Sequence, residues 1–502
     1  LPHLLNKKYD LIETSLKIRK NKRFDYDKIR YHLKNIPYID TKKTLSEITD
    51  VFIYKKFINN YLAVFNILDS KNKKLFGFNN PYEEIYRYLN VDGVSDNFYI
   101  SDKYDERLAK IRRDISEITQ KIEFKKREFL DKIKKIFDIE FKGDFVVVDA
   151  KNINQDFNQF FNIDIYDSKN VILKPKYDAE ILSLFCEREK LIAEEKSVES
   201  DIIVKIISEL EKYKNDIDIS IKAIETIDIA FASAELAVKF GLSRPNINST
   251  YIMIKGGFFI PLKEQLSKKN ISYTPLNFKF NKKINVIKGS NMGGKTVVLK
   301  TILLCQVMAQ YGLFVPAKSY YTMVFEEIGV ISNYDFKGLS SFAMEIYSFI
   351  EIYKKIDKKI LIIADEFAKT TNTFEAVAII NSIINDFSQK KNVYFFLATH
   401  LYGLLKSKNY DLLFMKGFNK LKYEKYFKNK KIEFDIWEKI KLINKFMNYK
   451  LVKINKEFKF SDALEIAKIL GIDDKIYKVA CENLEESYED SKKSKKNTNT
   501  WS

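Results

Sequence analysis

The stretch "INVIKGSNMGGKTVVLKTILL", residues 284–304, places the strongest constraint on what this chain can fold into. Residues 289–296 fit the pattern G-x-x-x-x-G-K-[ST]. The apolar run before the loop predicts a buried strand, and the longer run after it predicts a helix. A loop between such a strand and helix aims backbone N–H groups at phosphate oxygens. The stretch therefore predicts an α/β domain that binds a nucleotide.

Each position of this loop has an expected role. The glycines let the backbone turn tightly and approach the phosphates. Lys295 is expected to reach the outer phosphates, and the Thr296 hydroxyl is expected to ligate Mg²⁺. The predicted nucleotide-binding residues are Gly289, Ser290, Asn291, Met292, Gly293, Gly294, Lys295 and Thr296. The predicted cofactors are ATP and Mg²⁺.

Two further apolar strands end in residues suited to phosphate chemistry. The run "KKILIIADE" ends at Asp365 and Glu366, and "NVYFFLATH" ends at His400. We expect Asp365 to hold the Mg²⁺ shell and Glu366 to polarise the attacking water. His400 is expected to sense the γ-phosphate. Taken alone, an Asp-Glu pair is better explained as a helix cap or turn, and a lone His as a core or surface residue. The upstream phosphate loop favours the catalytic interpretation.

The region before the loop is predicted to be mostly helical. Apolar residues recur at helical spacing in two long charged segments, from Leu108 to Ile133 and from Ile181 to Leu210. Short β-branched runs lie between them, at about 144–175. This order predicts an arm of two antiparallel helices with a small β-rich tip. The alternative is that both segments are ordinary bundle helices.

The chain should therefore combine a P-loop α/β ATPase domain of ABC type with a mainly helical lever and clamp. Its 502 residues are enough for about two to four domains. The predicted parts are an N-terminal helical region (1–100), a lever and clamp (101–248, with its tip at about 140–175), an ATPase domain (249–447), a C-terminal helical segment (448–490) and a disordered tail (491–502).

Charge and cysteine content give weaker indications. The net charge is +18, which favours an anionic partner such as nucleic acid. An AT-rich coding bias would also produce a lysine-rich chain with solvated lysines, so both explanations stay open. The three cysteines are far apart, and we expect a cytoplasmic location. No apolar stretch approaches the roughly 20 residues of a membrane helix.

Several segments resemble the MutS family of ABC-type ATPases. They are "GSNMGGKT", "ADEFAKTTNTFEA", "FFLATH" and "KGLSSFAMEI". The resemblance is strong from about 250 to 403 and weaker from about 100 to 245. It implies a homodimer in which each site is made by two chains. Ser340 and Ser341 of one chain would approach the γ-phosphate bound to the partner, and Tyr273 would stack on the adenine.

Three departures from the family pattern bear on function. No Phe-x-Glu mismatch reader occurs in a fitting context, so direct mismatch reading is not expected. The loop after Glu366 reads Phe-Ala-Lys-Thr-Thr-Asn, where the family usually has Ile-Gly-Arg-Gly-Thr-Ser. Leu339 stands where an arginine is usual, and residues 404–447 are lysine-rich and unfamiliar.

Two functions compete. The first is an ATP-hydrolysing dimer that clamps DNA, with lysines and arginines contacting phosphates without reading sequence. The second is a protein-remodelling ATPase, since short MutS-like proteins include ones thought to reactivate cobalamin-dependent aminomutases. An ATP-binding scaffold that barely hydrolyses is a third possibility, and Glu366 argues against it.

Overall fold

The computed structural model describes residues 2–93, 99–331, 341–401, 403–404, 409–427, 435–453 and 462–497. The chain divides into two compact units. One unit contains Leu1–Lys20 and Ile229–Ser502, and the other contains Asn21–Asp228. The division falls within helix α9 (Lys214–Phe240). Within the described residues, no helix is both apolar enough and long enough to cross a membrane.

The first helix belongs to the unit that carries the phosphate loop. This helix, α1, runs from Pro2 to Asn21. The buried Tyr9 hydroxyl donates a 2.6 Å hydrogen bond to the carbonyl of Ala309. Arg244 pairs with Asp10 at 2.7 Å and with Glu13 at 3.0 Å. These contacts join residues some 230–300 positions apart. The sequence pattern, which predicts a separate N-terminal helical region at 1–100, could not indicate them.

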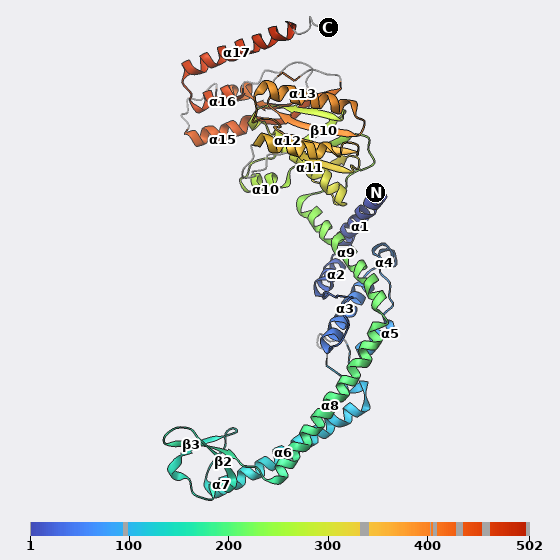
Figure 1. Ribbon diagram of the computed structural model, residues 1–502, viewed down its shortest axis with the longest axis vertical. Coiled ribbons are helices and arrows are strands. Elements are labelled where there is room, and N and C mark those ends of the chain that lie inside the picture. The colour runs from blue at the N-terminus through green and yellow to red at the C-terminus, as the bar shows by residue number, and fades with distance from the viewer. Residues whose placement is uncertain are drawn as a thin grey trace. The chain divides into compact units, whose positions relative to one another are not determined.

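A six-stranded sheet forms the centre of this unit (Figure 1). Its order is β12-β11-β6-β10-β9-β8. All neighbouring pairs are parallel except β11 with β12. The strands are β6 (Ile284–Lys288), β8 (Glu327–Ile331), β9 (Ile360–Asp365), β10 (Val393–Thr399), β11 (Tyr410–Phe418) and β12 (Met447–Lys453). This mixed α/β architecture agrees with the predicted class, because near-continuous apolar runs suit strands buried on both faces.

Helices cover both faces of the sheet. Helix α11 (Lys295–Tyr311) shares a core with one face, where Ile287 and Phe396 are buried. Helices α12 (Ser341–Tyr353) and α13 (Thr373–Gln389) share a second core with the other face, where Val286 and Phe395 are buried. Successive strand residues therefore enter different cores.

Smaller elements complete the unit. A second sheet has the order β5-β4-β7. Its strands are β4 (Ile252–Gly257), β5 (Leu276–Phe280) and β7 (Ser319–Tyr321), and α10 (Ile260–Lys268) follows β4. The last helices are α14 (Lys420–Phe427), α15 (Ile436–Phe446), α16 (Asp462–Leu470) and α17 (Asp474–Asn497). Helix α17 differs from the predicted disordered tail, which begins at residue 491. Its sequence contains no glycine or proline that would end the helix earlier.

The other unit is built around two long helices, α6 (Glu106–Phe137) and α8 (Ala179–Glu211). They lie side by side (Figure 1), and Arg112 binds Glu195 and Glu199 at 2.7 Å each. Further along, Lys125 binds Glu180 at 3.0 Å. The two helices are antiparallel, because Lys125, which follows Arg112 in α6, pairs with a residue of α8 that precedes the partners of Arg112. At 1.5 Å per residue, each helix is about 50 Å long.

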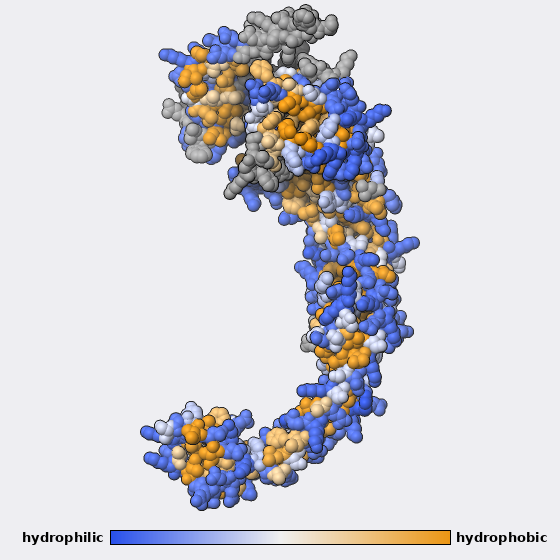
Figure 2. All heavy atoms as spheres, viewed as in Figure 1, coloured by the Kyte–Doolittle hydropathy of each residue, from blue (hydrophilic) through white to orange (hydrophobic). Residues whose placement is uncertain are grey.

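A three-stranded antiparallel sheet lies between these helices in the sequence. Its order is β1-β3-β2, with β1 (Val146–Asp149), β2 (Phe161–Ile165) and β3 (Asn170–Pro175). Helix α7 (Phe157–Phe160) precedes β2. Ile133 of α6 packs with Phe161 and Leu173 in the core of this tip. Hydrophobic residues are also exposed on the surface of the tip (Figure 2). Phe145 and Tyr166 of this region are 52% and 60% exposed.

The remaining helices of this unit before α6 are shorter than α6 and α8. They are α2 (Arg23–Asn35), α3 (Ile48–Ile67), α4 (Ser70–Phe76) and α5 (Glu83–Leu89). Tyr82 is fully buried, and its hydroxyl donates to Ser220 of α9 at 2.8 Å. Short 3₁₀ turns occur at Asp102–Tyr104 and Ala150–Asn152, and a third occurs in the phosphate loop at Asn291–Gly293.

Candidate nucleotide-binding site

The sheet register brings the predicted site residues to one edge. Thr399 of β10 pairs with Lys288 of β6, and Ala398 pairs with Asp365 of β9. These are the carboxyl ends of three parallel strands, so the segments that follow them emerge together. Ligands of open α/β sheets bind at this edge. The phosphate loop, the Asp365–Glu366 pair and His400 all lie at this edge.

Close packing explains two glycines of the phosphate loop. A Cβ atom on Gly289 would lie 2.9 Å from the Cβ of Met415, which is closer than side-chain atoms approach. Gly294 has a φ of +89°, in the left-handed region, and its Cβ would lie 3.2 Å from the Tyr449 ring. Side chains of strands β11 and β12 therefore pack directly against the backbone of the loop. Any other residue at 294 would strain the turn into α11.

Lys295 is buried inside the loop that it follows. Its Nζ donates to the carbonyl of Gly289 at 2.9 Å and to that of Ser290 at 3.0 Å. The side chain is 3% exposed. Burial lowers the pKa of this ammonium, and the nearby carboxylates of Glu366 and Asp365 oppose that shift. A buried cation of this kind is stabilised by an anion brought into the loop.

The start of α11 is suited to bind that anion. Among the described side chains, none caps the N-terminus of this helix, whose N-cap residue is Gly294. A helix N-terminus without a side-chain cap presents backbone N–H groups and a partial positive charge. Thr296 is the second residue of the helix, next to Lys295. The predicted phosphate-binding residues therefore fit a nucleoside triphosphate.

Asp365 provides an oxygen suited to a cation. Its Oδ1 is buried and has no hydrogen-bond partner among the described residues. Carboxylate and hydroxyl oxygens are the ligands that Mg²⁺ prefers. Asp365 and Thr296 are thus the residues that would hold Mg²⁺, which would neutralise charge on the phosphates when bound.

Glu366 lies among three positively charged or basic groups. Its Oε2 accepts a 2.6 Å hydrogen bond from Lys369, and its Oε1 lies 3.9 Å from the Nζ of Lys295. The Nδ1 of His400 lies 3.6 Å from Oε1, beyond hydrogen-bond distance. Burial raises the pKa of Glu366, but Lys369, Lys295 and His400 outweigh it, so the net pKa is lowered. The carboxylate is therefore ionised, as a general base must be.

The other predicted residues are placed as follows. Met292 is 49% exposed, and Asn291 begins the 3₁₀ turn, although its side chain lies outside the described residues. Ser341 begins α12, while Ser340 and Leu339 lie outside the described residues. The Tyr273 hydroxyl accepts a 3.0 Å hydrogen bond from the backbone of Phe259.

Three residues at the site were not predicted from the sequence. Lys369 binds Glu366, and its spacing of three residues is the only signal that could have suggested this contact. Glu345 of α12 accepts a 2.6 Å hydrogen bond from the backbone N–H of Ala368. Asp462 of α16 accepts from Ser290 at 3.0 Å and from the backbone of Phe418 at 3.1 Å. No local pattern indicates the last two contacts.

Comparison with known proteins identifies this region. The family description "MutS domain V" matches residues 285–486. The chain is 29% identical over 330 residues to the DNA mismatch repair protein MutS of Streptococcus thermophilus, covering 63% of this chain and 38% of that protein. It is 26% identical over 409 residues to the endonuclease MutS2 of Caldanaerobacter subterraneus, covering 76% and 49%.

A third relative matches over a shorter length. This is the endonuclease MutS2 of Caldicellulosiruptor saccharolyticus, at 31% identity over 223 residues, with 43% of this chain and 27% of that protein covered. The chain thus spans less than half the length of each of these three relatives. The match to the family description covers the six-stranded sheet and its phosphate loop. Residues 285–486 of this chain therefore match domain V of the MutS family.

Proposed function

We propose that this chain is an ATP hydrolase that uses Glu366 to activate the attacking water. The observation that carries the proposal is the placement of Glu366 beside Lys295 and His400, at the carboxyl edge of the sheet. An ionised carboxylate here can accept a proton from water as that water attacks in line. Lys295 and the start of α11 would hold the phosphates in the required orientation.

The test is the substitution Glu366→Gln, which keeps the size of the side chain and removes its basicity. We expect hydrolysis to fall about 100-fold or more, because a general base contributes roughly 10²- to 10⁴-fold. ATP affinity should change little, since Lys295 and the loop are intact. Single-turnover hydrolysis and equilibrium binding of ATP measure the two quantities. A variant that hydrolyses ATP at the normal rate would show that Glu366 is not the base.

The same proposal includes pairing of two chains. Ser340 and Ser341 of one chain would bind the γ-phosphate held by the partner. Helix α12 begins at Ser341 and packs against the same core as β9, which ends at Asp365. New contacts to the γ-phosphate would hold the pair closed, and hydrolysis would remove them.

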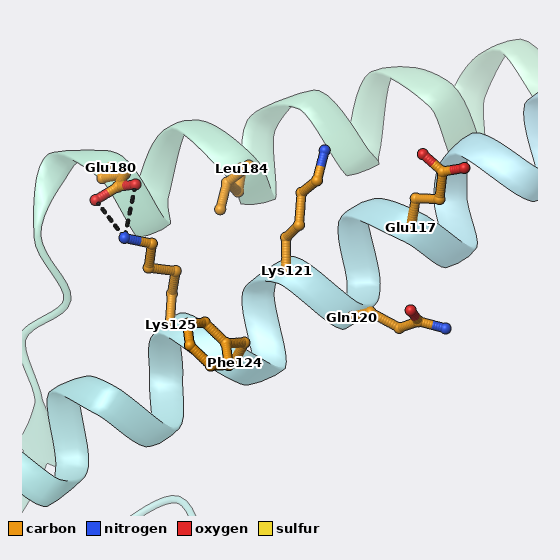
Figure 3. A pocket seen from close by; sticks show the side chains of 7 residues that line it. All are labelled: Glu117, Gln120, Lys121, Phe124, Lys125, Glu180 and Leu184. Atoms are coloured by element: carbon orange, nitrogen blue, oxygen red, sulfur yellow. Dashed lines mark hydrogen bonds and ion pairs between the residues drawn. The ribbon is translucent and has the colours of Figure 1, made fainter.

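DNA is the first candidate for the object on which this cycle acts. The relatives of this chain include a DNA mismatch repair protein and an endonuclease. The arm of α6, the tip and α8 would then hold the nucleic acid, and binding would weaken steeply with salt. Lys121 and Lys125 line a groove of about 400 Å³ between α6 and α8 (Figure 3). Lys125 also pairs with Glu180, however, so this groove is not uniformly basic.

Charge along the arm supports a second candidate, a protein-remodelling ATPase. Residues 106–211 contain 20 basic and 23 acidic side chains, so the excess of +18 lies elsewhere in the chain. Within the tip, residues 138–178 contain eight acidic and five basic side chains. Phe145 and Tyr166 are exposed there. An acidic surface with exposed aromatics suits a protein partner better than a phosphate backbone.

One experiment separates the two candidates. ATP hydrolysis is measured with and without duplex and branched DNA at about 50 mM and about 200 mM salt. Stimulation by DNA that falls at least tenfold at the higher salt supports the clamp. Reversal of the charge at Lys121 should then reduce stimulation, whereas reversal at Lys263, in α10 of the other unit, should not. Hydrolysis unaffected by every DNA at low salt would exclude the DNA clamp and favour a protein substrate.

A further inference from the structure

The turn that follows β9 is conformationally unusual. Glu366 has a φ of +52° and Ala368 a φ of +60°, and neither residue is glycine. The left-handed region is unfavourable for residues with a Cβ, and such strain persists only where the surroundings hold it. Phe367 between them is buried against Phe349 of α12, with ring centroids 6.0 Å apart. The strained turn thus carries the carboxylate that the proposed mechanism uses.

Glu345 holds this turn from α12. Its side chain is 1% exposed, and Oε2 accepts the 2.6 Å hydrogen bond from the N–H of Ala368. The other oxygen, Oε1, is buried and has no hydrogen-bond partner among the described residues. Burial raises the pKa of Glu345, while the Ala368 N–H and the charge of Lys369 oppose the shift. Burying a carboxyl group costs free energy, and one hydrogen bond to an amide offsets only part of that cost. The contact is therefore better explained by a need to hold the Ala368 N–H in place.

The position of Glu345 on α12 adds a second consequence. The helix begins at Ser341, and Glu345 lies one turn further along. Backbone hydrogen bonds hold the turn to β10 as well, because the N–H of Glu366 donates to the carbonyl of Ala398 at 2.9 Å. A movement of α12 would therefore act on one end of the turn while β10 fixes the other.

We propose that Glu345 is a positioning residue that fixes the 366–368 turn through the Ala368 N–H, and so aims the Glu366 carboxylate for hydrolysis. The inference rests on the proposed function of Glu366 as the general base. It also links that base to the helix whose first residue is expected to face the nucleotide of the partner chain. Glu345 itself does not touch the nucleotide in this mechanism.

The test compares binding with hydrolysis in the full-length chain. In Glu345→Ala, hydrolysis at saturating ATP and Mg²⁺ should fall at least tenfold, because small displacements of a catalytic group have effects of up to about 100-fold. The dissociation constant for ATP should stay within threefold of the normal value. Glu345→Gln should retain most activity, because its amide oxygen can still accept from Ala368. Glu351→Ala is the matched control, since Glu351 is an exposed residue of the same helix, paired with Lys354.

Rescue by glycine distinguishes positioning from general loss of structure. Ala368→Gly makes the left-handed conformation available without strain. Added to Glu345→Ala, it should recover at least threefold of the lost rate, an effect that a purely structural defect would not show. If Glu345→Ala does not fold, Glu345→Asp takes its place. This variant keeps the charge but is one methylene too short to reach the Ala368 N–H, so its hydrolysis rate should fall in the same way.

Two results would overturn the proposal. One is hydrolysis by Glu345→Ala within twofold of the normal rate. The other is a lost rate that Ala368→Gly does not restore at all. Failure of the underlying mechanism would look different, because Glu366→Gln would then hydrolyse ATP normally whatever the residue at 345.

Discussion

Lys295 illustrates how a single residue prepares the phosphate loop. Its ammonium binds two carbonyl groups of the loop, those of Gly289 and Ser290. These bonds keep a buried charge satisfied, and a phosphate can replace them with stronger charge-assisted bonds. The pattern in the sequence predicts a phosphate-binding role for Lys295, because the loop pattern is local and its geometry follows from a few backbone angles.

The prediction at this scale concerns Lys295→Met, which keeps the length of the side chain. Affinity for ATP should fall about 10- to 100-fold, the equivalent of losing about 1.5 to 3 kcal/mol of charged hydrogen bonding. Isothermal titration calorimetry measures the loss. Lys300→Met is the control, because Lys300 is an exposed residue of the same helix. Equal affinities for the two variants would rule out the phosphate role of Lys295.

The elements of the site differ in how far the sequence could indicate them. Strands β6, β9 and β10 were visible as apolar runs, and each ends at a predicted site residue or immediately before one. The contacts of α12 and α16 with the site were not visible. Glu345 and Asp462 reach residues 23 and 172 positions away, and neither lies in a pattern with a fixed partner. Such contacts depend on how helices pack against the sheet.

Helix α16 fastens the C-terminal segment to the phosphate loop through Asp462. Its Oδ2 accepts from Ser290 and from the backbone of Phe418, and a Cβ on Gly417 would clash with it. Burial raises the pKa of Asp462, and the two hydrogen bonds oppose that shift. Asp462→Ala should therefore loosen the loop. Amide hydrogen exchange at residues 290–293 should accelerate about tenfold or more, for a loss of about 1.5 kcal/mol or more.

A matched control for this experiment is Asp473→Ala. The side chain of Asp473 accepts from the backbone of Lys475 at the exposed start of α17. This substitution should leave exchange in the phosphate loop unchanged. If the loop exchanges at the same rate in both variants, the contact with Asp462 does not stabilise it.

Helix α3 gives a prediction that depends on pH. Asp50 and Glu47 form a capping box at its start, and Lys43 donates to Asp50 at 2.7 Å. The hydrogen bond from Lys43 is the largest cause that lowers the pKa of Asp50 below its ordinary value of 3.8, with the N–H groups of Ser46 and Glu47 adding to it against burial. Because the folded pKa is the lower one, Asp50 stabilises the fold above pH 3.8 and loses this effect as pH falls through the folded value.

Asp50→Ala should therefore destabilise the chain by about 1 to 2 kcal/mol near pH 7. The difference from the unsubstituted chain should shrink as the pH falls below about 4. Urea denaturation at a series of pH values measures this. Asp27→Ala removes an exposed carboxylate paired with Arg23 and should have a much smaller effect. A difference that grows on acidification would contradict the assignment.

At the scale of the whole molecule, the proposal requires two chains to meet around ATP. The chain has a mass of 59.1 kDa. With ATP and Mg²⁺, Glu366→Gln should form a complex of about twice that mass, because the γ-phosphate contacts that hold the pair are not removed. Light scattering after size-exclusion chromatography measures the mass. Lys295→Met should stay a single chain under the same conditions. A single-chain mass for Glu366→Gln saturated with ATP would refute the pairing.

The sequence by itself determined the α/β class, and it predicted the phosphate loop and the Asp365–Glu366 pair. These depend on local patterns, namely apolar runs of strand length and a loop whose spacing is fixed by phosphate geometry. Only the tertiary structure decided that Lys369 and Glu345 bind the turn after β9, that Asp462 binds Ser290, and that α1 packs beside α11. The three long-range contacts join residues far apart in the chain, so they arise from packing rather than from local pattern. Lys369 lies only three residues from Glu366, and the turn that contains this pair has two residues in the left-handed region, Glu366 and Ala368, which residues with a Cβ do not favour.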